Sequence, residues 1–363
     1  MKYGYLFLGI MLCISCQKNN TPTPDPIPLP AGMYFPAIGS SNWQTISADS
    51  LGWHTAALPD LYNYLQQKHS KAFIILKSGK IVTEQYFGSF TQDSLWYWAS
   101  AGKTLTGLLV GIAQQEGYLN INETTSKHLG TGWTSLPPAK EQLITIRNQL
   151  NMTTGLDDGV SNSDCTDPDC LQYKADAGSR WAYHNAPYTL LGKVVAQATG
   201  SSFSNYFQQK IRDKIGMNGF WLTVDGYNNV YYSNARCMAR YGLLLLNKGT
   251  WNNSTAVLAD TAYFNQQVNS SQTINPSYGY LTWLNGKAKH MLPQTQFLFN
   301  GAIIPNAPAD MYCALGKNDQ KVYVVPSQEL VVIRMGESAD ESLFSVTGFD
   351  NELWLQLKNI IGY

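Results

Sequence analysis

Hydrophobic and polar positions divide the chain into strands, then helices, then strands. Short apolar runs at 72–76 and 81–86 predict two strands, and the turn residues between them, 77–80, predict a β-hairpin. A helix is expected next, with Gly117 at its end. Its apolar positions recur at i, i+3, i+4, i+7 and i+8, namely Leu105, Leu108, Leu109, Ile112 and Ala113.

The middle of the chain, from about 125 to 268, has mostly helical patterns separated by long loops, whereas the end of the chain returns to strands. Predicted helices lie at 190–198, 204–215, 235–247 and 349–361, and predicted strands at 278–284, 311–315, 321–325 and 330–335. Strands at both ends most simply share one antiparallel sheet. We therefore expect an α+β fold, an antiparallel sheet flanked by helices and built from N- and C-terminal segments, with an inserted mainly helical region. The sheet region would cover about 34–124 and 269–363, and the helical region about 125–268.

Composition narrows the possible classes of protein. The 363 residues carry 25 Lys and Arg against 25 Asp and Glu, and 44% of them are hydrophobic. A disordered chain would combine low hydrophobicity with high net charge, and a general nucleic-acid binder would need an excess of basic residues. Both classes are excluded, and the length allows a large core in one or two domains.

The N-terminus has the pattern of an export signal. Lys2 precedes an apolar run, Tyr5–Leu12, that is shorter than the roughly 18 residues needed to span a bilayer. The run ends in CISC, which resembles a bacterial lipobox with Cys16 as the lipidated first mature residue; simple secretion with removal of the signal is the alternative. Residues 17–33 include five prolines and indicate an extended tether. We thus expect a signal at 1–16, a tether at 17–33, and a protein held at the cell envelope by a lipid anchor in the membrane.

Four further cysteines fit an exported protein. Cys165 and Cys170 stand in the turn-rich run SDCTDPDC, where oxidising conditions favour a local disulfide. A metal site is the alternative, but no Cys or His lies at ligand spacing and no HExxH motif is present. Cys237 and Cys313 fit buried apolar positions better than reactive thiols. We predict no metal and no cofactor.

The first candidate for chemistry is Ser100-Ala101-Gly102-Lys103, immediately before the strongest amphipathic helix. Residues at i and i+3 share a helix face, so the Lys103 amine can reach the Ser100 hydroxyl. A serine is a poor nucleophile without a base, and a desolvated lysine can act as one. The apolar run 95–99 could provide dry surroundings. The alternative is an ordinary helix-capping serine with a solvated lysine.

A second candidate is Tyr183-His184-Asn185, which follows a turn at 177–179 and precedes the predicted helix at 190–198. Other Tyr-x-Asn triplets occur, and Tyr232-Ser233-Asn234 is the nearest rival because it also precedes a helix. The preceding Trp181 and the turn favour Tyr183.

Together these motifs resemble those of the serine penicillin-recognising hydrolases, the group of class C β-lactamases, D-alanyl-D-alanine carboxypeptidases, family VIII-type carboxylesterases and aminohexanoate-dimer hydrolases. The resemblance runs from about residue 70 to the C-terminus, so 34–363 would form one such domain, and it includes the segments 144–156, 238–243, 275–280 and 324–332. It implies that Ser100 attacks a carbonyl and that Lys103 and Tyr183 share the proton transfers. It also implies that Asn185 orients the substrate amide or Lys103.

The third motif of that family, Lys-Thr-Gly or His-x-Gly on an edge strand, is incomplete. The matching positions are Ala314-Leu315-Gly316 followed by Lys317, so only the glycine remains. Gly316 would let the strand approach the substrate, and the Lys317 N–H would complete an oxyanion hole with the Ser100 N–H. Recognition of a β-lactam or a peptide carboxylate is disfavoured, unless the Lys317 side chain replaces the missing cation.

The resemblance implies an exported serine hydrolase that forms an acyl-enzyme with a small ester or amide. A D-alanyl-D-alanine carboxypeptidase, a β-lactamase and a non-catalytic binding lipoprotein of the same fold are the alternatives. We expect protonated Lys103 to lower the pKa of Tyr183, the two titrating as a coupled pair. Asp157 and Asp158 are either an acid/base pair or an acidic surface turn. The oligomeric state stays open.

Overall fold

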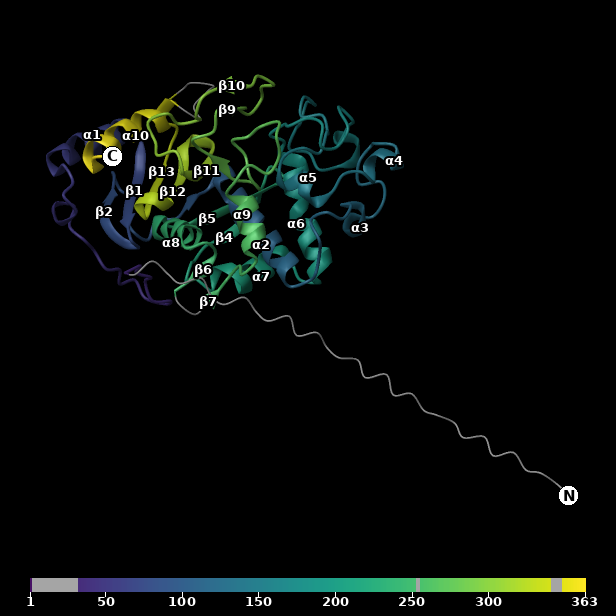
Figure 1. The fold of residues 1–363 in the computed structure, drawn as a ribbon, viewed down its shortest axis with the longest axis horizontal. Helices are drawn as coiled ribbons and strands as arrows, with labels where there is room; N and C mark the ends of the chain where they lie inside the picture. The colour runs from purple at the N-terminus through teal and green to yellow at the C-terminus, as the bar shows by residue number, and fades with distance from the viewer. Residues whose placement is uncertain (2–31, 253–254, 341–347) are drawn as a thin grey trace.

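The computed structural model describes residues 1, 32–252, 255–340 and 348–363 (Figure 1). All of the predicted signal except Met1, and most of the predicted tether, fall within residues 2–31. Lipidation at Cys16 therefore lies outside the described residues. No helix in the described ranges has the length and hydropathy needed to cross a bilayer.

The fold is organised around a six-stranded antiparallel sheet with the order β2-β1-β13-β12-β11-β8. Its strands are β1 (Ser70–Lys77), β2 (Lys80–Tyr86), β8 (Trp283–Leu284), β11 (Tyr312–Gly316), β12 (Gln320–Val325) and β13 (Leu330–Gly336). The N-terminal hairpin joins the C-terminal strands where β1 pairs with β13, with Ile74 opposite Ile333. The predicted α+β class is confirmed.

Helices cover both faces of this sheet. Trp354 of α10 (Gly348–Ile361) contacts Tyr323 of β12, with ring centroids 5.4 Å apart. On α8 (Ala235–Leu246), a Cβ at Gly242 would lie 3.1 Å from Val322 and 2.4 Å from Val331, so a glycine is required for this close packing. Successive strand residues point to opposite faces, so α10 and α8 lie on opposite sides (Figure 1). Helix α1 (Leu58–Gln67) packs beside α10 and on β1.

The rest of the described chain contains the inserted helices. Helix α2 (Lys103–Gln115) packs against α6 (Asn185–Thr199), which ends at Gly200 in the left-handed conformation. The other helices are α3 (Ser126–Leu129), α4 (Pro138–Glu141), α5 (Ile146–Leu150), α7 (Phe203–Phe207) and α9 (Thr261–Gln267). Helix α8 lies within the range 125–268 yet packs on the main sheet.

The structure adds a second sheet that the sequence patterns did not predict. It consists of β3 (Trp96–Tyr97), which precedes the predicted helical region, and of β4 (Phe220–Val224) and β5 (Asn228–Ser233) within it, and it is stabilised by aromatic contacts. One sequence expectation was wrong. The predicted strand 278–284 is reduced to β8, since Leu281 has a φ of 52°. Minor strands are β6 (Thr250–Trp251), β7 (Thr255–Ala256), β9 (Lys289–His290) and β10 (Phe299–Asn300).

Candidate active site

Ser100 lies in a tight 3-10 turn, Ala99–Gly102, that leads directly into α2. Ala99 has a φ of 46°, a strained conformation for a residue with a Cβ. The turn is fixed by the buried Trp98, whose backbone N–H donates to the Tyr231 carbonyl and whose ring N–H donates to Ser233 Oγ, both at 2.8 Å. The second sheet therefore positions the serine at the start of α2.

Lys103 is the first residue of α2, and its Nζ lies 3.0 Å from Ser100 Oγ. The side chain is only 4% exposed, and Nζ lies 4.2 Å from the ring centre of Tyr188 and 5.3 Å from that of Tyr183. Burial lowers the pKa of Lys103 to about 7, and the charge of Asp164 opposes this shift. A large share of the amine is therefore neutral near pH 7 and able to accept a proton.

Tyr183 precedes α6 and reaches the same serine. Its ring stacks on Trp283, with centroids 5.7 Å apart, and packs edge-on to Tyr278. Burial raises the pKa of Tyr183 well above 10, and a hydrogen bond with Ser100 only partly offsets this. The expectation that protonated Lys103 lowers this pKa was wrong, because burial dominates at Tyr183 and favours the neutral amine at Lys103.

The rival tyrosine lies elsewhere. Tyr232 is on β5, opposite Tyr97 of β3, and its ring stacks on Phe220 with centroids 5.6 Å apart. The structure thus gives Tyr183 the contact with Ser100 and gives Tyr232 a place in the second sheet.

Asn185 begins α6 but has an unexpected partner. Its Nδ2 donates to Asp164 Oδ1 at 2.7 Å. The structure therefore shows Asn185 engaged with a carboxylate and not with the Lys103 amine. Sequence reasoning missed Asp164, whose one signal was its place directly before a disulfide cysteine.

The end of β11 lies against the serine turn. A Cβ added to Gly316 would be 2.4 Å from the Trp98 carbonyl oxygen and 2.9 Å from the Ala101 nitrogen, so only glycine fits this approach. Lys317 follows in a short turn with its side chain exposed. The turn is held by Arg334, which donates to the carbonyl oxygen of Asn318 at 2.9 Å.

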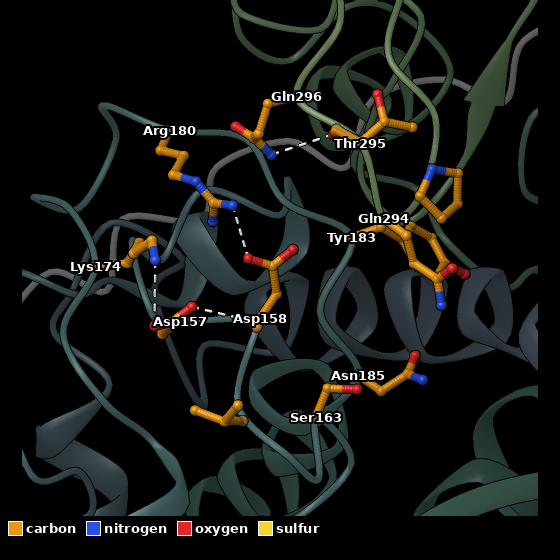
Figure 2. Close-up of a pocket in the computed structure, with 13 residues that line it drawn as sticks. Asp157, Asp158, Ser163, Lys174, Arg180, Tyr183, Asn185, Gln294, Thr295 and Gln296 are labelled. Carbon is orange, nitrogen blue, oxygen red and sulfur yellow. Dashed lines mark hydrogen bonds and ion pairs between the residues drawn. The ribbon is translucent and has the colours of Figure 1, made fainter.

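A pocket of about 630 Å³ opens beside Tyr183 and Asn185 (Figure 2). Asp158 on its wall forms an ion pair with Arg180 at 2.7 Å, and Asp157 forms one with Lys174 at 3.4 Å. Each carboxylate of this acidic pair therefore faces a cation on the pocket wall. The segment 293–296 forms the opposite wall.

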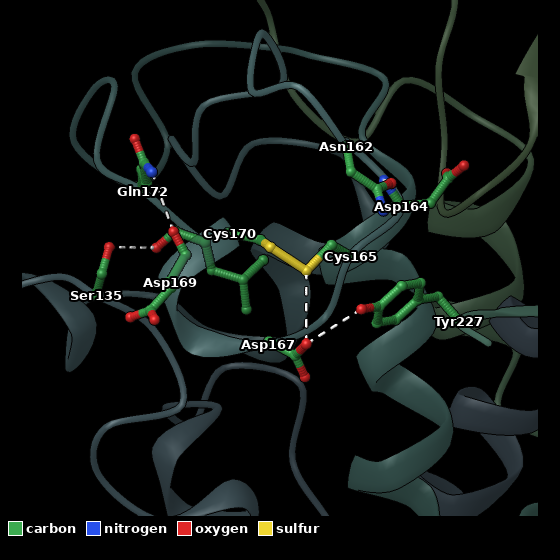
Figure 3. The surroundings of a disulfide bond; sticks show 10 residues. Ser135, Asn162, Asp164, Cys165, Asp167, Asp169, Cys170, Gln172 and Tyr227 are labelled. Carbon is green, nitrogen blue, oxygen red and sulfur yellow. Dashed lines mark hydrogen bonds between the residues drawn. A yellow bond between two sulfur atoms is a disulfide. The ribbon is translucent and has the colours of Figure 1, made fainter. Parts of the chain in front are cut away.

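Cys165 and Cys170 are joined by a disulfide (Figure 3). Cys237 and Cys313 are buried free thiols, and burial raises the pKa of both, that of Cys237 to about 11. Among the described residues, no group of three or more His, Cys, Asp and Glu side chains could hold a metal ion.

The architecture defines a class, the penicillin-recognising serine hydrolase fold in which a sheet and a helical region meet at the N-terminus of α2. The β-lactamase family profile matches residues 64–342, and the chain belongs to this family. The resemblance inferred from the sequence motifs is confirmed.

Two relatives match this chain at about a quarter identity. A protein of Alkalihalophilus pseudofirmus, itself uncharacterized, is 25% identical over 311 residues, which cover 76% of this chain and 85% of the relative. A Bacillus subtilis protein, provisionally described as penicillin-binding protein PbpX, is 25% identical over 181 residues, 45% of this chain and 44% of that protein.

Solved structures share the fold at low identity. A Bacteroides dorei protein, provisionally described as a β-lactamase, has a TM-score of 0.68 at 16% identity, and the match covers 86% of this chain and all of the other. A Bacillus anthracis protein, provisionally described as a 6-aminohexanoate-dimer hydrolase, has a TM-score of 0.64 at 19% identity, covering 82% and 81%. At such identities these matches establish the fold alone.

Proposed function

We propose that this protein is an exported serine hydrolase that cleaves a small ester or amide through an acyl-enzyme. The observation that carries the proposal is the 3.0 Å separation of Ser100 Oγ from Lys103 Nζ, combined with a lysine pKa of about 7. A serine with a neutral amine at hydrogen-bonding distance is an activated nucleophile.

The proposed first step is acylation. Neutral Lys103 takes the Ser100 proton as Oγ bonds to the substrate carbonyl carbon, and the backbone N–H groups of Ser100 and Lys317 stabilise the oxyanion. The bond to the leaving group then breaks, and the leaving group takes the proton from Lys103 through the Tyr183 hydroxyl. Tyr183 keeps its own proton at rest because its pKa is raised, so it acts as a relay and not as the resting base.

Deacylation uses Lys103 as the base a second time. Lys103, neutral again, accepts a proton from water as the water oxygen attacks the acyl carbon, and Ser100 recovers its proton when its bond to the acyl group breaks. Water thus supplies both the hydroxyl group of the acid product and the proton that Lys103 returns to Ser100.

The substrate class follows from the third motif. Ala314 and Leu315 are buried in β11 and have no charge, so this strand lacks the cation that would hold a substrate carboxylate. Neutral esters and amides fit this site better than β-lactams or D-alanyl peptides. The penicillin-binding relative keeps D-alanyl-D-alanine carboxypeptidase or β-lactamase activity as the second candidate.

Export and anchoring are part of the same proposal. The lipobox-like end of the signal, the proline-rich tether and the Cys165–Cys170 disulfide all suit the oxidising cell envelope. Metabolic labelling with a radioactive fatty acid should mark the wild-type chain but not a Cys16→Ala variant. Labelling of both would contradict lipidation at Cys16.

One panel of substrates tests the activity. The full-length chain in detergent is incubated with a p-nitrophenyl ester, an aminohexanoate dimer, nitrocefin and a D-Ala-D-Ala peptide, each beside a Ser100→Ala variant. We expect turnover of the ester or the amide and its loss in the variant. Turnover of nitrocefin or the peptide alone would favour the second candidate, and turnover of none would favour a binding lipoprotein.

A further inference from the structure

The loop that contains the disulfide lies on the N-terminus of α6. The backbone N–H of Ala186, in the first turn of this helix, donates to the Ser163 carbonyl oxygen at 3.2 Å. Asn162 closes the same loop, because its side chain accepts from the Asp164 N–H at 3.1 Å and its carbonyl accepts from the Cys165 N–H at 3.2 Å. The backbone on both sides of Asp164 is therefore fixed next to Asn185.

The Cys165–Cys170 bond closes the loop on its far side (Figure 3). Tyr227 adds a tie to the second sheet by donating to Asp167 Oδ2 at 3.1 Å. A carboxylate in such a fixed segment keeps a constant place relative to the helix that it faces.

We propose that Asp164 is a positioning residue of the Ser100–Lys103 centre, whose carboxylate holds the Asn185 amide and supplies the negative charge that acts on Lys103. This inference rests on the proposed function and deepens it. The carboxylate accepts from Asn185 Nδ2 at 2.7 Å. The amide nitrogen is thereby held by the loop, and Asn185 Oδ1 is buried with no hydrogen-bond partner among the described residues.

The charge of Asp164 also reaches Lys103. Burial lowers the pKa of the amine, and Asp164 is the carboxylate that raises it again. Removing the negative charge should therefore lower the pKa further, and neutral Lys103 should persist to lower pH. The acid limb of the pH–rate profile, where the rate falls as Lys103 becomes protonated, should therefore also move to lower pH.

The other titratable groups around the centre are accounted for. The rings of Tyr183 and Tyr188 face Lys103 from the α6 side, and burial raises the pKa of both phenols. His184 is buried directly before α6, within the electrostatic influence of Asp164, the ion-paired Asp157 and Asp158, and Arg180. Burial lowers the pKa of His184 to about 4, so it stays neutral across the acid limb.

The test separates charge from geometry. Asp164→Asn keeps an oxygen that can accept from Asn185 but removes the charge, whereas Asp164→Ala removes both. Asp169→Asn is the matched control, an identical change at an exposed position of the same loop. The readout is the rate of labelling by a serine-reactive fluorophosphonate between pH 4.5 and 9, together with kcat and KM on the best ester.

For Asp164→Asn we expect the acid limb to move down by about half a pH unit or more, as a nearby opposite charge is removed, with KM within about twofold of wild type. For Asp164→Ala we expect the same shift and, in addition, a fall in kcat. Asp169→Asn should match wild type. An acid limb at the wild-type position in Asp164→Asn would overturn the inference while leaving the proposed function intact, and a shift of equal size in Asp169→Asn would also overturn it. Absence of Ser100 labelling in wild type would overturn both.

Discussion

Replacing Lys103 by Met should stabilise the fold, because the wild-type protein keeps a lysine amine in a dry site. The pKa of this amine is 10.5 in ordinary lysines and about 7 here. The unfolded chain therefore binds more protons than the folded chain between these values, and wild-type stability rises with pH across that window. Methionine has a similar length and no charge, so the variant lacks this dependence.

The magnitude follows from the two pKa values. One pKa unit corresponds to about 1.4 kcal/mol. Burial of the lysine then costs about 5 kcal/mol at pH 6 and about 2 kcal/mol at pH 9. The gain in unfolding free energy from Lys103→Met should thus shrink by about 3 kcal/mol between these two pH values.

Urea unfolding followed by tryptophan fluorescence at pH 6 and pH 9 measures this difference. Lys193→Met, at an exposed position on α6, is the control and should show no such pH trend. The activity of Lys103→Met on the ester should be lost at both pH values. A stability difference that is the same at pH 6 and pH 9, or a variant that is less stable than wild type at pH 6, would refute the argument.

Two other substitutions probe the remaining groups of the site. Tyr183→Phe should reduce kcat/KM by about 100-fold or more, which is the range expected for loss of a proton-transfer group. Tyr232→Phe should stay within about threefold of wild type because its ring lies in the second sheet. Equal losses in the two variants would reverse our choice of tyrosine. Gly316→Ala should lower kcat by about tenfold or more in steady-state kinetics. The added Cβ would lie 2.4 Å from the Trp98 carbonyl oxygen and displace the end of β11, which carries the proposed oxyanion donor. A variant with the wild-type kcat would show that β11 does not need this glycine.

Local patterns made much of the fold predictable. The hairpin of β1 and β2, helix α2 and the late strands β12 and β13 all follow periodicities that lie within one segment. Within the second sheet, the hairpin of β4 and β5 was overlooked although it is local, and its Asp225-Gly226 turn is a sequence signal for it. Strand β3 was missed because it has only two residues and its pairing with β5 depends on contacts far away in the sequence. The predicted strand 278–284 failed for a similar reason.

The segment 278–284 shows how packing can override a hydrophobic pattern that predicts a strand. A Cβ at Gly279 would lie 2.0 Å from the Gln267 carbonyl oxygen, so the backbone there follows the end of α9. Alternating apolar residues alone do not reveal such a contact. Only Trp283 and Leu284 remain as a strand.

The candidate site could likewise be predicted only where its contacts are local in the sequence. The closeness of Ser100 and Lys103 follows from helix geometry at i and i+3 and could be read from the sequence. The bond between Asp164 and Asn185 joins positions 21 residues apart, and no motif marks the acid. The raised pKa of Tyr183 depends on burial, which the sequence does not give.

The most direct test of the central claim is to trap the covalent intermediate. The full-length protein is mixed with excess p-nitrophenyl ester, quenched in acid within the first turnover, and digested for mass spectrometry. The account predicts one acyl group, located on the peptide that contains Ser100 and missing from Ser100→Ala. An acyl group on another residue, or one that persists in Ser100→Ala, would contradict it.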